Sequence, residues 1–194
     1  MVDYNQKSKD RFVDPNEVFS HELPKIHDLK ARKTVIAMLN AAPEEFWFAP
    51  SAFSGKYHSP DEFGLGGQVL HTKRVFYQMM VLLCAEAPEF TDKEMDEHMC
   101  AALIHDTLAG STGSNDHVST IVSYYSSHLP QKILDILWWE GICNVATYHM
   151  GRWTPKALGP TEWPDNVLLH YADMIATNSN SLPILKEHDY TIRR

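Results

Sequence analysis

The chain has 194 residues, 44% of them apolar and 11% aromatic, and its formal net charge at pH 7 is -8. This composition is typical of a globular protein, and the length suits one domain covering residues 1–194. The negative charge argues against a surface that coats long nucleic acid, and no apolar run is long enough for a bilayer, so we expect no membrane partner and a cytoplasmic location.

The apolar residues recur with a helical period almost throughout, which predicts an all-α bundle of about six or more helices. In chain order we expect helices near residues 25–42, 67–87, 91–107, 116–127, 131–150 with Gly141 as a candidate break, and 165–177. Thr91 and Glu94 fit a capping box that starts the third of these helices. The stretches 48–66 and 152–164 are rich in turn residues and are predicted to be loops that border a site.

The three cysteines lie in apolar helical patterns without the spacing of a metal site. We expect Cys84, Cys100 and Cys143 to be buried thiols in a reducing compartment.

The pair His105-Asp106 ends an apolar run, and further isolated histidines and an aspartate lie in segments that otherwise indicate buried helix. Imidazoles and carboxylates are costly to bury unless they are paired or bind a metal. The sequence therefore predicts a metal centre, with one or two ions, built from His71, His105, Asp106, His117, His149 and Asp173. Mixed imidazole and carboxylate ligands suit Mn, Fe, Co, Ni or Zn, and the two oxygens of Asp106 could bridge two ions.

The order of these residues resembles the HD-domain superfamily of metal-dependent phosphohydrolases. The segments GGQVLHTKRV, AALIHD, YHMGRW and LLHYAD are similar to the family's ligand-bearing segments, over a motif core of residues 56–178. The resemblance implies that His71, His105, Asp106 and Asp173 are the core ligands, with His105 and Asp106 as the catalytic pair, and that His117 and His149 hold a second ion.

Two features bear on how far the resemblance extends. Many family members follow the doublet with a Gly-Lys element, whereas this chain has Thr107 to Gly110 there and lacks that lysine. The interval between Asp106 and His117 is short, so His128 is the nearest alternative to His117.

Four residues near the matched segments are candidates to contact a substrate phosphate, and they are Lys56, His58, Arg74 and Arg152. Trp153 could stack on a base, but we expect it to pack in the core or against a loop. We expect His170 to lie beside the metal ligands without being one.

The resemblance implies a nucleotidase-like enzyme that hydrolyses a small nucleotide-type phosphate ester with a metal-activated hydroxide. Four alternatives remain open at this point. They are a 3'-5' exoribonuclease, a cyclic-nucleotide phosphodiesterase, a diiron oxygenase of the same superfamily and a catalytically silent nucleotide-binding domain.

Overall fold

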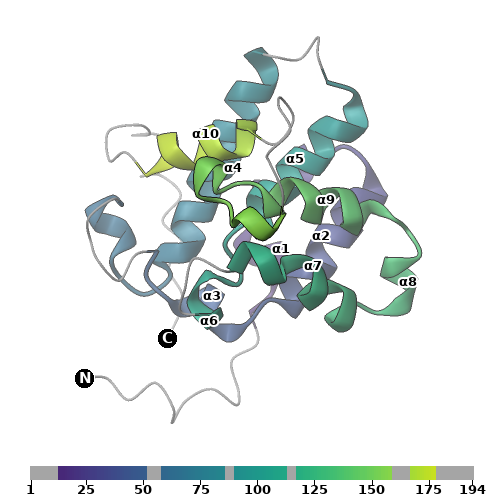
Figure 1. Cartoon of the computed structure of the whole chain (residues 1–194), viewed down its shortest axis with the longest axis horizontal. Helices are drawn as coiled ribbons and strands as arrows, with labels where there is room; N and C mark the ends of the chain where they lie inside the picture. Colours follow the sequence, from purple (N-terminus) through teal and green to yellow (C-terminus); the bar gives the residue numbers. More distant parts are fainter. Residues whose placement is uncertain (1–12, 52–57, 86–89, 113–116, 159–166, 178–194) are drawn as a thin grey trace.

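The computed structural model describes residues 13–51, 58–85, 90–112, 117–158 and 167–177, and within these ranges every regular element is helical (Figure 1). The predicted all-α fold class is confirmed. The α-helices are α1 (Pro15–Val18), α2 (Leu29–Ala41), α3 (Glu44–Phe48), α4 (Gly67–Ala85), α5 (Asp92–Ile104), α6 (Ala109–Thr112), α7 (His117–His128), α8 (Gln131–Leu134), α9 (Trp138–Thr147) and α10 (Val167–Ala176). Short 3-10 turns occupy Leu23–Lys25, Pro60–Glu62, Gly151–Trp153 and Lys156–Leu158.

Helix α5 lies at the centre of the packing. It contacts α2, α4 and α9, while α10 packs on α4 and α7 packs on α9. Its last turn, from Cys100 to Ile104, is fully buried. The capping box at its start is present, since Thr91 accepts from the amide of Glu94 and Glu94 accepts from the amide of Thr91. The His105-Asp106 doublet follows α5 directly and therefore lies in the middle of the molecule.

The helix predicted over 131–150 is two helices, and Gly141 is not the break. The break lies at Leu137, which has a left-handed φ of 62° and precedes α9. Gly141 lies inside α9 beside Glu97 of α5, and a Cβ there would be 2.1 Å from Oε1 of Glu97, so the end of that flexible side chain would have to move. The prediction of a break at Gly141 was wrong.

Other boundaries differ in smaller ways. Helices α1, α3 and α6 were not predicted, and α5 ends at Ile104, so the doublet occupies the following turn. Cys100 and Cys143 are buried free thiols as expected, but Cys84 is exposed near the end of α4.

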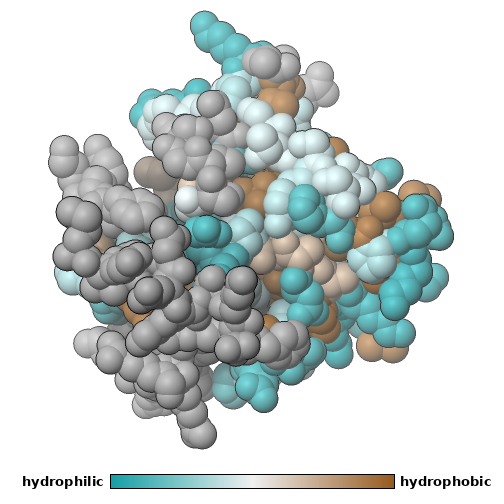
Figure 2. Space-filling model, turned by 90° about the horizontal axis from the view of Figure 1, so that it is seen from below, coloured by the Kyte–Doolittle hydropathy of each residue, from teal (hydrophilic) through white to brown (hydrophobic). Residues whose placement is uncertain are grey.

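The surface seen in Figure 2 mixes polar and apolar residues, and the apolar ones form separate small groups on the described part of that face. Among the described residues, no helix has both the length and the apolar character that crossing a membrane would require.

Candidate metal centre

Five helices bring the predicted ligand side chains to one place. The side chains are His71 in α4, His105 and Asp106 directly after α5, His117 at the first position of α7, His149 shortly after α9, and Asp173 in α10. Successive imidazole rings are in contact, with centroids 5.6 Å apart for His71 and His105, 5.0 Å for His105 and His149, and 5.1 Å for His149 and His117. We call these six residues the metal-ligand cluster.

Asp106 lies between three of the histidines. Its Oδ1 is 3.0 Å from Nε2 of His117 and 3.2 Å from Nε2 of His149. Its Oδ2 is 3.6 Å from Nε2 of His105 and accepts a hydrogen bond of 3.3 Å from Nε2 of Gln68. The carboxylate thus presents one oxygen to each half of the cluster, an arrangement that can bridge two ions.

Asp173 and Glu62 face opposite nitrogens of His71. Oδ1 of Asp173 lies 3.0 Å from Nε2, and Oε2 of Glu62 lies 3.6 Å from Nδ1. Neither contact has hydrogen-bond geometry, and the imidazole is fully buried. Burial alone would lower the pKa of His71, but the two carboxylates outweigh it and raise the pKa to about 10.

Backbone carbonyls fix the orientation of two further rings. Nδ1 of His105 lies 2.9 Å from the carbonyl oxygen of Ala102, and Nδ1 of His149 lies 2.7 Å from that of Ala146. A ring nitrogen can bond a carbonyl only as a donor, so Nδ1 carries the proton in both rings. In the neutral imidazole Nε2 then presents a lone pair to the cluster, as a metal ligand requires.

His105 gives the clearest indication that a cation belongs here. Burial lowers its pKa to about 4, so the ring is neutral near pH 7. Its Nε2 is buried and has no hydrogen-bond partner among the residues that the structure describes, and the nearest of their carboxylate oxygens, from Asp106, also offers only lone pairs. Two lone pairs facing each other in a buried site are unfavourable unless a cation lies between them.

The charges of the cluster lead to the same conclusion. Within the described part of the chain, Asp106 and Asp173 form ion pairs with histidines and with no lysine or arginine. Burial raises the pKa of Asp106, but the imidazoles of His105, His117 and His149 hold it well below the usual range. The donor set fits a divalent transition ion, and the cluster could hold one.

Glu62 is a member of this site that the sequence did not indicate. It is fully buried, accepts from His58 at 2.9 Å and from Arg74, and faces His71. It lies in the segment 48–66 that was predicted as loop, and its burial depends on residues of α4. Gln68 was missed for a similar reason, since an isolated glutamine carries no motif.

Glycine permits the close approach of Glu62 to α4. A Cβ on Gly67 would lie 1.8 Å from the backbone oxygen of Glu62. The 3-10 turn Pro60–Glu62 therefore packs directly on the first residue of α4, one turn before His71.

The four predicted substrate contacts have different surroundings. Arg74 is buried and bonds both Asp61, at 3.0 Å, and Glu62. His58 bonds Glu62. Arg152 is exposed, and its guanidinium lies over the ring of Trp153.

Lys56 lies outside the described residues. The phosphate-binding role of these four residues stays a prediction.

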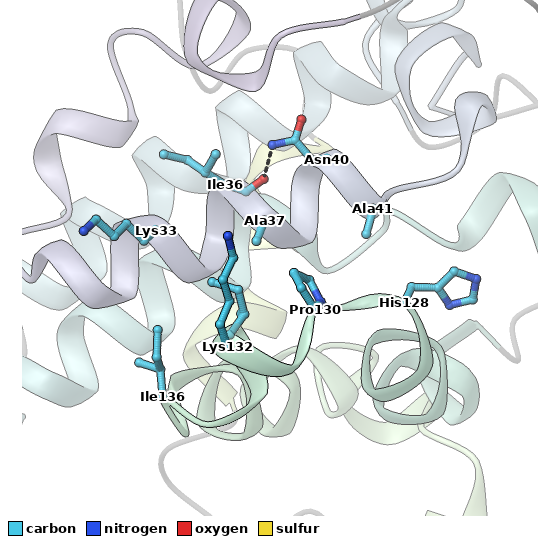
Figure 3. Close-up of a pocket in the computed structure, with 10 residues that line it drawn as sticks. Lys33, Ile36, Ala37, Asn40, Ala41, His128, Pro130, Lys132 and Ile136 are labelled. Atoms are coloured by element: carbon cyan, nitrogen blue, oxygen red, sulfur yellow. Dashed lines mark hydrogen bonds between the residues drawn. The ribbon is translucent and has the colours of Figure 1, made fainter.

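His128, the alternative to His117, lies at the other end of α7, about 16 Å away at 1.5 Å per residue. It is exposed and stacks on Tyr124 at 4.0 Å. It lines a shallow groove of about 700 Å³ between α2 and the α7–α8 connection, where Lys132 extends toward α2 (Figure 3). That groove is separate from the metal-ligand cluster, and the geometry favours His117 as the ligand.

Comparisons of this chain with protein-family descriptions, with curated proteins and with solved structures gave no significant match.

Proposed function

We propose that this chain is a metal-dependent phosphohydrolase of the HD-domain type that acts on a nucleotide-type phosphate ester. One observation carries the proposal: side chains singled out by their order in the sequence lie together, and Nε2 of His105 is buried there with no hydrogen-bond partner in the described part of the chain. A motif that matched by chance would scatter its residues over the fold.

We propose that His71, His105, Asp106 and Asp173 hold a first ion, and that Asp106, His117 and His149 hold a second. The ion would be Mn, Fe, Co, Ni or Zn. When bound, such an ion polarises a phosphoryl oxygen and lowers the pKa of a bound water, which supplies the nucleophile for hydrolysis.

The chain's own residues orient the site. The backbone carbonyl oxygens of Ala102 and Ala146 accept hydrogen bonds from Nδ1 of His105 and His149. These bonds keep both Nε2 atoms turned toward the cluster. Glu62 lies on the Nδ1 side of His71, where a carboxylate fixes the ring and increases its basicity. Asp106 is 16% exposed, so its carboxylate also reaches the solvent side from which substrate would enter.

Arg152 is the best placed of the predicted phosphate contacts. Arg74 is already paired with two carboxylates, whereas Arg152 is exposed and forms no ion pair with the residues that the structure describes. An arginine fork can bind phosphate through two parallel hydrogen bonds.

The test is a product assay with the purified protein and Mn or Co. Mononucleotides, cyclic nucleotides and short RNA are incubated separately, and products are resolved by chromatography with parallel measurement of free phosphate. We expect phosphate release from mononucleotides and loss of activity by at least about a hundredfold in Asp106→Asn. The matched control is Asp135→Asn, since Asp135 is an exposed acid bonded to Gln131.

Other results would replace the proposal. Opening of cyclic nucleotides or trimming of RNA ends without mononucleotide hydrolysis would assign one of the alternative activities. Oxygen consumption by the iron-loaded protein without phosphate release would indicate oxygenase chemistry, and nucleotide binding without turnover would indicate a silent domain.

A further inference from the structure

Trp153 forms an exposed ring on the turn that follows His149, contrary to the expectation that it packs in the core or against a loop. It is 48% exposed. Cζ of Arg152 lies 4.3 Å from the ring centroid, so the cation covers part of the ring, and the ring of His170 approaches at 5.6 Å with a 58° tilt. About half of the tryptophan surface remains open to a ligand.

The ring is held firmly to the fold beneath it. It belongs to the 3-10 turn Gly151–Trp153, in which Gly151 has a φ of 54°. A Cβ on Gly151 would lie 2.8 Å from the ring of His170, so the turn packs directly on α10. A single exposed tryptophan is ordinary, but one on a turn anchored in this way is oriented before any ligand arrives.

His170 joins this turn to the cluster. Its Nδ1 donates to the carbonyl oxygen of His149 at 2.9 Å, while its ring contacts Trp153. This agrees with the expectation that His170 lies beside the ligands without being one. His170 therefore links the exposed ring to the backbone of His149, whose side chain is a candidate metal ligand.

We propose that Trp153, on the ring surface that Arg152 leaves uncovered, forms a stacking platform for the base of a mononucleotide substrate whose phosphate lies at the metal-ligand cluster. The inference rests on the proposed function. A nucleobase offers a flat π-face that stacks on an aromatic ring, which is the chemistry that the exposed ring of Trp153 presents.

The charge around the platform favours one nucleotide over a strand. Besides Arg152, the described segment 151–158 contains a single cation, Lys156, and the whole chain carries a net charge of -8. A nucleic-acid strand is held chiefly by several lysines and arginines on successive phosphates. Because stacking alone does not depend strongly on base identity, we expect all four mononucleotides to bind.

The test measures binding of adenosine, which carries no phosphate, so that binding of the base is separated from hydrolysis. Adenosine and ribose are titrated calorimetrically into the metal-loaded wild type, Trp153→Leu and Trp153→Phe, with KM and kcat for AMP and ribose 5-phosphate measured in parallel. Trp138→Leu is the matched control, because Lys93 lies 5.7 Å over the ring of Trp138 at the far end of α9 from His149. Circular dichroism and Tm verify that the variants fold.

The platform predicts that the wild type prefers adenosine to ribose and that Trp153→Leu weakens adenosine binding about tenfold. Trp153→Phe should retain most of the affinity, and Trp138→Leu should match the wild type. The KM for AMP should rise in Trp153→Leu, with kcat and the KM for ribose 5-phosphate unchanged.

Equal adenosine affinity in the wild type and Trp153→Leu would overturn the platform, as would no preference for adenosine over ribose. A tetraribonucleotide that binds more than tenfold tighter than AMP through Trp153 would replace the single base with a strand. The proposed function fails separately: a wild type that binds adenosine through Trp153 but releases no phosphate from AMP would keep the platform and exclude the phosphohydrolase.

Discussion

Nε2 of His149 lies 3.2 Å from Oδ1 of Asp106. Because Nδ1 of this ring donates to the carbonyl oxygen of Ala146, Nε2 presents a lone pair to Oδ1 of Asp106 whenever the ring is neutral. Protonation of the ring or binding of a metal ion relieves this opposition. Asp106 raises the pKa of His149 against the effect of burial, so a proton on Nε2 is favoured more than in a free imidazole.

Metal binding should therefore release protons even in mildly alkaline solution. The pKa of His71 is raised to about 10, so the ring keeps its proton until the pH approaches that value, and coordination through Nε2 must remove it. His105, with its pKa near 4, has no proton to give. Calorimetric titration at pH 8 in two buffers of different ionisation enthalpy should report the release of about one proton or more per protein. Identical heats in the two buffers would contradict this.

Glu62→Gln should weaken metal binding by about 10- to 100-fold, as expected when the group that orients a ligating histidine is lost. Asp61→Asn is the matched control, since Asp61 also bonds Arg74 but is 51% exposed and does not face His71. Competition with a chelating dye measures both affinities. An equal loss of metal affinity in the two variants would show that Glu62 acts on the site only through its contact with Arg74.

Gly67→Ala should destabilise the protein by about 1–3 kcal/mol, because the added Cβ collides with the backbone of Glu62 and the turn must move. At Gly64 a Cβ would meet nothing within 4 Å, so Gly64→Ala provides the comparison. Urea denaturation gives both free energies of unfolding. A Gly67→Ala variant as stable as Gly64→Ala would mean that the turn does not pack on α4 as described.

His117→Ala should lower metal affinity or stoichiometry, whereas His128→Ala should leave both unchanged. His117 lies 3.0 Å from Asp106, while His128 is exposed and bonds the carbonyl of Tyr124 at the other end of α7. Metal analysis after dialysis distinguishes the two variants. A loss in His128→Ala alone would assign the ligand to the alternative histidine.

The sequence predicted the helical fold and the membership of the cluster, because helical periodicity and isolated polar residues in apolar segments are local signals. It did not predict where the long helix breaks. Gly141 lies inside α9 beside Glu97, and the break falls at Leu137, a residue type that rarely adopts a positive φ.

Contacts between distant segments explain why the sequence did not predict the burial of Glu62 or the exposure of Trp153. Glu62 lies in a stretch with the composition of a loop, and its burial is decided by Arg74 and His58. The exposure of Trp153 depends on how its turn packs against His170, which no pattern within the turn reveals.

Metal content is the most direct test of the cluster. Wild-type protein, Asp106→Asn and Asp135→Asn are loaded with Mn or Co, dialysed and analysed for metal, with circular dichroism to verify folding. We predict one or two equivalents in the wild type and in Asp135→Asn, and a loss of most of the metal in Asp106→Asn, because Asp106 lies between three histidines. A folded Asp106→Asn protein that retains the wild-type metal content would contradict the metal centre described here.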